Sequence, residues 1–107
     1  MTISVLLIDD DSFHRQGLRT FLQLNQFQVE EADNAEAGLM MASQQDFGAA
    51  VVDIRLPQTQ GARPTHHPTG IALARAIKER QPALGIVLLS AYENYGAEIA
   101  PQQSLFC

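Results

Sequence analysis

Acidic and hydroxyl side chains stand at the points where apolar runs of the sequence stop. They are Asp9 and Asp10 after residues 5–8, Asp53 after residues 49–52, and Ser90 after residues 86–89. Carboxylates that converge repel one another, and a hard divalent cation such as Mg²⁺ relieves the repulsion while leaving room for a phosphate oxygen. A carboxylate in such a cluster is also a candidate nucleophile towards phosphorus, because carboxylates form acyl phosphates. The pattern therefore indicates magnesium-assisted phosphoryl chemistry.

The triplet Asp9-Asp10-Asp11 has a second interpretation when it is taken alone. Acidic residues are common just before a helix, where they cap its first turn and remain solvated. The triplet by itself does not separate the two interpretations. The carboxylate at Asp53 and the hydroxyl at Ser90, each at the end of another apolar run, favour the site.

The elements that would position these residues alternate between strand and helix. The apolar patterns predict strands over residues 5–8, 27–30, 49–52 and 86–89, and helices over residues 12–24, 34–44 and 70–80. Ser12 is the expected N-cap of the first helix, and Asp33 with Glu36 is typical of a capping box before the second. Such alternation predicts an α/β fold with a doubly wound parallel sheet. In such a sheet the site lies beyond the carboxyl ends of the strands.

Three segments together resemble the receiver domain of two-component response regulators. They are Val5-Leu6-Leu7-Ile8-Asp9-Asp10-Asp11, Val51-Val52-Asp53-Ile54-Arg55-Leu56-Pro57 and Ile86-Val87-Leu88-Leu89-Ser90-Ala91-Tyr92. The resemblance runs from about residue 3 to residue 95. It implies a flavodoxin-like receiver fold.

The resemblance also implies roles for single residues. Asp53 would be the phosphoacceptor, and its phosphoryl group would come from a histidine kinase or a phosphotransfer protein. Asp9 and Asp10 would hold Mg²⁺ with Asp53, and the backbone carbonyl of Arg55 would be a further ligand to the metal. Ser90, with Ala91 beside it, would hydrogen-bond the phosphoryl group and move on activation.

The chain departs from the family pattern in two places. Residues 58–69 are an expected loop insertion, and either Gly61 or Gly70 could be the glycine that leads into the next helix. The family's fifth strand, its lysine and its fifth helix lack counterparts, since only 17 residues follow Ser90 and Lys78 precedes it. The strand at 86–89 is then expected to present an open apolar edge that favours self-association into a homo-oligomer.

Composition narrows the class of protein. The 107 residues are expected to form one domain, residues 1–107, and a net charge of -5 without a basic stripe argues against direct nucleic-acid binding. No apolar run is long enough to cross a membrane, and Cys107 is the single cysteine, so we expect a cytoplasmic chain without an internal disulfide. His14 is expected to be solvated in the first helical turn.

These observations predict a phosphoacceptor signalling module of a phosphorelay. It would not be an enzyme, beyond autocatalytic transfer to its own aspartate. A phosphorylation-defective protein that uses the receiver surface to bind a kinase or regulator is the main alternative, because the family lysine is missing. A hydrolase with an aspartyl-phosphate intermediate ranks last, since Arg55 occupies the place of its second aspartate.

Overall fold

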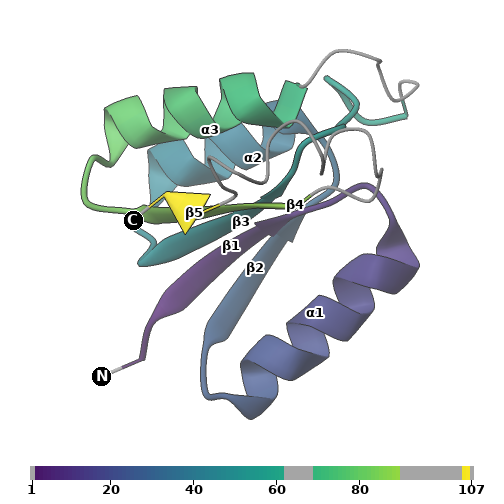
Figure 1. Ribbon diagram of the computed structural model, residues 1–107, viewed down its shortest axis with the longest axis vertical. Helices are drawn as coiled ribbons and strands as arrows, with labels where there is room; N and C mark the ends of the chain where they lie inside the picture. The colour runs from purple at the N-terminus through teal and green to yellow at the C-terminus, as the bar shows by residue number, and fades with distance from the viewer. Residues whose placement is uncertain (1, 62–68, 90–104, 107) are drawn as a thin grey trace.

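The computed structural model describes residues 2–61, 69–89 and 105–106, which form a twisted sheet with helices on both faces (Figure 1). The elements along the chain are β1 (Ser4–Ile8), α1 (Ser12–Leu24), β2 (Gln28–Ala32), α2 (Ala35–Gln44), β3 (Ala49–Asp53), α3 (Thr69–Arg80), β4 (Gly85–Leu89) and β5 (Leu105–Phe106). The strand order is β2-β1-β3-β4-β5, and β1 to β4 pair in parallel. The predicted parallel α/β fold is confirmed.

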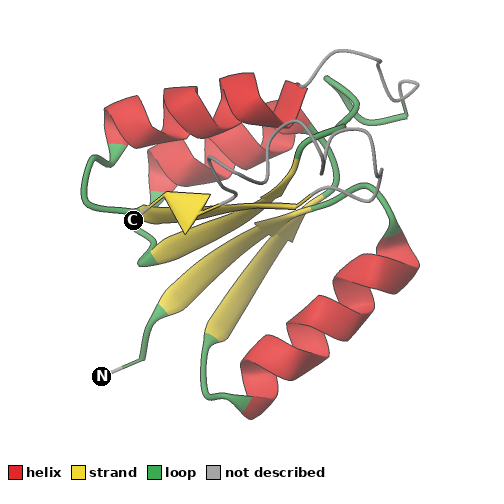
Figure 2. Ribbon diagram, in the orientation of Figure 1, coloured by secondary structure: helices red, strands yellow, loops and turns green. Residues whose placement is uncertain are grey.

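The sheet separates α1 from α2 and α3, which lie together on the opposite face (Figure 2). The main core fills the space between the sheet and α2 and α3. Alternate residues of β1, β3 and β4 point into it, including Leu6, Ile8, Val52, Ile86 and Leu88. Each of these side chains leaves water on folding, which stabilises the domain through the hydrophobic effect.

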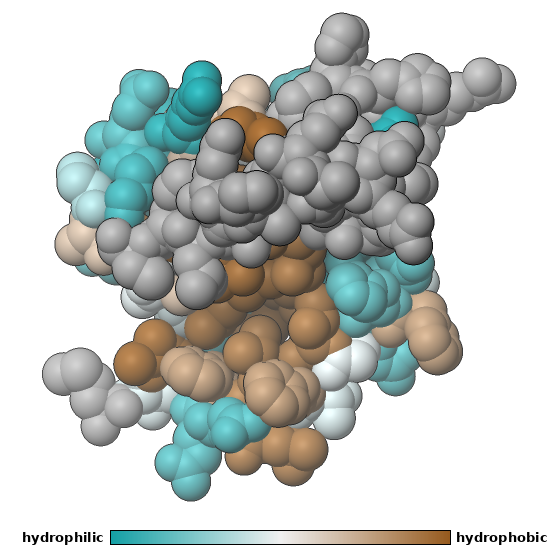
Figure 3. Space-filling model, in the orientation of Figure 1, coloured by the Kyte–Doolittle hydropathy of each residue, from teal (hydrophilic) through white to brown (hydrophobic). Residues whose placement is uncertain are grey.

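The face that carries α1 is covered less completely. No residue of α1 is buried, and its Phe13, Phe21 and Leu24 are 86%, 62% and 78% exposed. On the strands that lie further from α1, Val51, Val87 and Leu89 are only half-buried. A hollow of about 570 Å³ lies between the helix residues Phe13 and Leu18 and the strand residue Leu89, and apolar surface gathers around a hollow in Figure 3. Within the described part of the chain, β1 is buried on both faces, whereas β3 and β4 are buried mainly on the face towards α2 and α3.

The far edge of β4 is partly paired. Phe106 and Leu105 lie opposite Ile86 and Val87, and they run antiparallel to β4. The expectation of an open edge along residues 86–89 is therefore wrong at Ile86 and Val87. The described part of the chain has four parallel strands and three helices, fewer than a complete receiver, and the two-residue β5 runs antiparallel to β4.

The caps of the first two helices differ by one residue from those predicted. Asp11, not Ser12, caps α1, since its carboxylate accepts the amide protons of Phe13 and His14. Asn34, not Asp33, caps α2, since its side-chain oxygen accepts the amide proton of Ala37. Asp, Asn and Ser are similarly good N-caps, so the position where the chain turns into the helix decides which is used.

Candidate functional site

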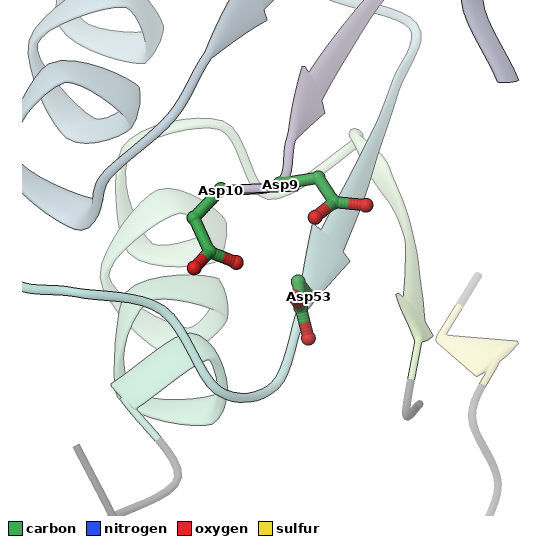
Figure 4. Close-up of side chains that lie close together, drawn as sticks. All are labelled: Asp9, Asp10 and Asp53. Atoms are coloured by element: carbon green, nitrogen blue, oxygen red, sulfur yellow. The ribbon is translucent and has the colours of Figure 1, made fainter. Parts of the chain in front are cut away.

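Three carboxyl groups meet beyond the ends of two neighbouring strands. Asp9 and Asp10 follow β1 directly, and Asp53 is the last residue of β3, which lies next to β1. Each residue offers an oxygen that lies within 4.8 Å of the oxygens offered by the other two. Figure 4 shows the three side chains around a common space. Because β1 lies between β2 and β3, this space is at the point where the strand order reverses.

The negative charges of this cluster destabilise one another. Burial raises the pKa of Asp53 to about 7, and the neighbouring carboxylates of Asp9 and Asp10 add to the effect. The pKa of Asp10 is also raised, first by burial and then by Asp9 and Asp11. Asp9 itself is 1% exposed. A cation placed among these groups would favour their charged forms.

Backbone amides help to fix the carboxylates of Asp9 and Asp53. The amide of Arg55 donates to Asp53 Oδ1 at 3.1 Å, and the amide of Asp11 donates to Asp9 Oδ1 at 2.9 Å. Each contact spans two residues, so it forms as the chain turns away from the strand end. The turns therefore orient the carboxylates before any ligand binds.

Two side chains of α1 also reach Asp9, and the sequence did not reveal either contact. His14 Nδ1 lies 2.5 Å from Asp9 Oδ2, and Arg15 Nη1 donates to the main-chain oxygen of Asp9. Arg15 is itself held by Glu31 of β2, at 2.9 Å. His14 is exposed in the first turn of α1, as the sequence predicted, with 52% of its side chain exposed, and it makes the contact with Asp9 in addition. The spacing of five residues from Asp9 to His14 was the only signal in the sequence.

Gly70 is the glycine that brings α3 against the end of β3. Its amide donates to the carbonyl of Ile54 at 2.7 Å, and a Cβ atom at this position would lie 1.9 Å from the carbonyl oxygen of Asp53. Gly61 lies in a turn with φ of 80° and has nothing within 4 Å of the equivalent position. Of the two candidates that the sequence left open, Gly70 and not Gly61 is the glycine at the start of the next helix. Thr69, expected as the last loop residue, is the first residue of α3.

The single lysine of the chain lies away from the site. Lys78 donates to the carbonyl of Leu84, just before β4 begins, whereas the three aspartates follow the opposite ends of the strands. Lys78 therefore does not take the place of the family lysine. Ser90 and Ala91, the expected phosphoryl-binding residues, lie outside the described residues.

The donor set suits a hard divalent cation. Asp9, Asp10 and Asp53 offer carboxylate oxygens, and Mg²⁺ prefers a small number of such oxygens together with waters. Burial and the neighbouring carboxylates raise the pKa values of Asp10 and Asp53, and a bound cation would offset this effect. The residues present thus fit the metal that the resemblance implies.

Among the helices of the described residues, none combines the length and the apolar character that crossing a membrane requires.

Comparison with known proteins gives a consistent result. The response regulator receiver domain family matches residues 5–101. The photosynthetic apparatus regulatory protein RegA of Rhodovulum sulfidophilum is 30% identical over 97 residues, which cover 91% of this chain and 48% of RegA. The chain spans less than half the length of the first curated relatives that it matches.

Two solved structures share the fold. A response regulator from Burkholderia pseudomallei with a phosphorylated aspartic acid, a calcium ion and citrate is 26% identical, with a TM-score of 0.71 over 84% of this chain and 48% of that one. The response regulator TrrA of Thermotoga maritima in complex with Mg²⁺ and BeF is 24% identical, with a TM-score of 0.74 over 95% of this chain and 80% of that one. The fold, the acidic cluster and the family match agree, and the chain belongs to the response regulator receiver domain family.

Proposed function

We propose that the chain is a phosphoacceptor module that receives a phosphoryl group on Asp53 from a histidine kinase or a phosphotransfer protein. The observation that carries this proposal is the convergence of Asp53 with Asp9 and Asp10 beyond the ends of β3 and β1. Bound Mg²⁺ would neutralise charge on the carboxylates and on the phosphoryl oxygens. We assign the metal to the three aspartates and to the backbone carbonyl of Arg55.

The proposed transfer forms one bond and breaks one bond. A carboxylate oxygen of Asp53 bonds to phosphorus, and the bond from phosphorus to the imidazole nitrogen of the donor breaks. The imidazole keeps the electron pair and takes up a proton. Since Oδ1 accepts the Arg55 amide, we assign the bond to phosphorus to Oδ2. Ser90, with Ala91 beside it, is the proposed hydroxyl for the phosphoryl oxygens.

A small phosphodonor tests this assignment. Incubation of the chain with acetyl phosphate and Mg²⁺ is expected to add one phosphoryl group, and intact-mass spectrometry reads the product. Asp53→Asn should remove the adduct, whereas the exposed aspartate variant Asp46→Asn should keep it. We expect a short-lived adduct, because the described residues place no lysine beside the cluster. An adduct that survives in Asp53→Asn would refute the proposal.

Divalent cation binding gives a second prediction. Asp10→Asn and Asp53→Asn should each remove most of the Mg²⁺ affinity measured by calorimetry, since each takes one carboxylate out of a cluster that needs a counter-charge. Asp46→Asn is the matched control, because it makes the same change at an exposed position outside the cluster. An unchanged affinity in Asp53→Asn would show that the metal binds elsewhere.

A second candidate function is binding of a kinase or regulator without phosphoryl transfer. The exposed Phe13, Phe21 and Leu24 of α1 favour it, as does the position of Lys78 at the other end of the sheet. The phosphodonor experiment separates the two functions, since only the first gives an adduct on Asp53.

The remaining expectations belong with this proposal. We propose that residues 1–107 form one domain with a loop insertion at 58–69. We also propose that the chain lies in the cytoplasm, does not contact nucleic acid directly, and is not an enzyme beyond autocatalytic phosphoryl transfer to its own aspartate. Self-association through the rest of the β4 edge is also proposed, although β5 already pairs with Ile86 and Val87.

A further inference from the structure

We propose that His14 is a positioning residue for the cation site, because its imidazole holds the buried carboxylate of Asp9 in place. The inference rests on the proposed function, since it concerns the same acidic cluster. It assigns a role to a residue of α1 that is not one of the proposed metal ligands.

The carboxylate of Asp9 has a hydrogen-bond partner on each oxygen. Oδ1 accepts the amide of Asp11 at 2.9 Å, and Oδ2 lies 2.5 Å from His14 Nδ1. A ring nitrogen that carries a proton can donate to a carboxylate oxygen, so we assign the Nδ1–H tautomer of His14 to this contact. Asp9 is 1% exposed with the imidazole in place, so these protein donors and not bulk water satisfy its carboxylate.

The backbone of Asp9 is held separately from its side chain. Its amide donates to the carbonyl of Ala32 at 3.0 Å, and its carbonyl accepts from Arg15, which Glu31 braces at 2.9 Å. These contacts fix the main chain but leave the carboxylate free to rotate about the side-chain torsions. In the described part of the chain, the hydrogen bonds from His14 and from the Asp11 amide limit this rotation.

The orientation of Asp9 matters because the three carboxylates repel one another. Without a donor on Oδ2, the Asp9 carboxylate is expected to turn away from Asp10 and Asp53, and the oxygens would no longer converge. Hydrogen bonds to ligating carboxylates have this orienting effect in other metal sites, where their loss costs about 10-fold to 100-fold in affinity. His14 therefore supports the cation site by orienting Asp9, without touching the cation itself.

The test compares three variants of the whole chain. His14→Ala is expected to lower the affinity for Mn²⁺, followed by paramagnetic relaxation of water, and for Mg²⁺, followed by calorimetry, by about 10-fold. His14→Asn should restore most of this loss, because its amide nitrogen can occupy the place of Nδ1 and donate to Asp9. Gln16→Ala, an exposed change on the same helix, should bind as the unsubstituted chain does. Thermal unfolding of each variant shows that the fold is kept.

Three results would overturn the proposal. Equal cation affinity in His14→Ala and the unsubstituted chain would refute the role of His14 while leaving the proposed function in place. Equal losses in His14→Ala and His14→Asn would show that donation to Asp9 is not what matters. Absence of cation binding by the unsubstituted chain would refute both the metal site and this inference. A ¹⁵N spectrum of the metal-free chain tests the contact itself, since donation to Asp9 requires a proton on Nδ1 of His14.

Discussion

Replacement of Gly70 by alanine is expected to lower the free energy of unfolding by about 3 kcal/mol. A Cβ atom at this position would lie 1.9 Å from the carbonyl oxygen of Asp53 and 2.7 Å from Cα of Ile54. Both are backbone atoms, so no side chain can rotate to make room. The end of β3 or the start of α3 must shift, and the hydrogen bond from the Gly70 amide to Ile54 must lengthen or break.

The same shift should reduce phosphoryl transfer to Asp53, because Asp53 directly precedes Ile54, whose carbonyl accepts the Gly70 amide. Chemical denaturation of Gly70→Ala gives the stability change, and the acetyl phosphate reaction gives the change at the site. Gly17→Ala is the matched control, since nothing lies within 4 Å of a Cβ atom there and the residue is exposed in α1. This control should gain up to about 1 kcal/mol from helix propensity. Equal stability of the two variants would show that α3 does not press on β3.

The metal-free protein is expected to lose stability as the pH rises from about 5 to about 7.5. Burial and the neighbouring carboxylates raise the pKa of Asp53 to about 7 in the folded chain, from 3.8 for the free side chain. Between these values the folded state keeps a proton that the unfolded state has lost, so unfolding is favoured by raising the pH. Above about pH 7 the loss is complete. Asp10, whose pKa is also raised, contributes with the same sign.

The size of this effect is the difference in pH-dependent free energy of unfolding between the unsubstituted chain and Asp53→Asn. Full conversion of the pKa shift would overstate it, since Asp53 is only partly buried, and we expect about 2 kcal/mol after solvent screening. Denaturation curves at about pH 5 and about pH 8, in the presence of a chelator, provide the measurement. Excess Mg²⁺ should stabilise the protein at the higher pH. If the pH dependence of stability is the same in Asp53→Asn, burial and repulsion do not raise the pKa of Asp53.

The order of strands and helices follows from the sequence because it depends on local patterns. Ser12–Leu24 is a helix with the bounds that its periodicity predicts, and Ala49–Asp53 and Gly85–Leu89 extend the predicted strands by one residue. Apolar residues repeat at a helix or strand period within each segment, so each element can be predicted without knowledge of its tertiary contacts. The sequence also shows that carboxylates follow the first and third strands, which made the acidic cluster predictable.

The covering of the sheet could not be predicted in the same way. Val51, Val87 and Leu89 belong to apolar runs that suit a strand buried on both faces, yet they are half-buried, because α1 lies beside β1 and β2 and does not cover them. Gly38 is unfavourable within a helix by propensity alone. In the structure it lets α2 approach β1, since a Cβ atom there would meet the side chain of Ile8 at 2.6 Å.

The sequence by itself determined a parallel α/β receiver with aspartates at its strand ends, since hydrophobic period and strand termination are local properties. Only the tertiary structure decided the separate tasks of the adjacent acids. Asp11 caps α1, while Asp9 and Asp10 meet Asp53 from the neighbouring strand. It also decided that His14 touches Asp9 and that Gly70 touches the backbone of Asp53. Such contacts depend on strand order and on the direction in which each side chain leaves the backbone, and residues far apart in the sequence set both.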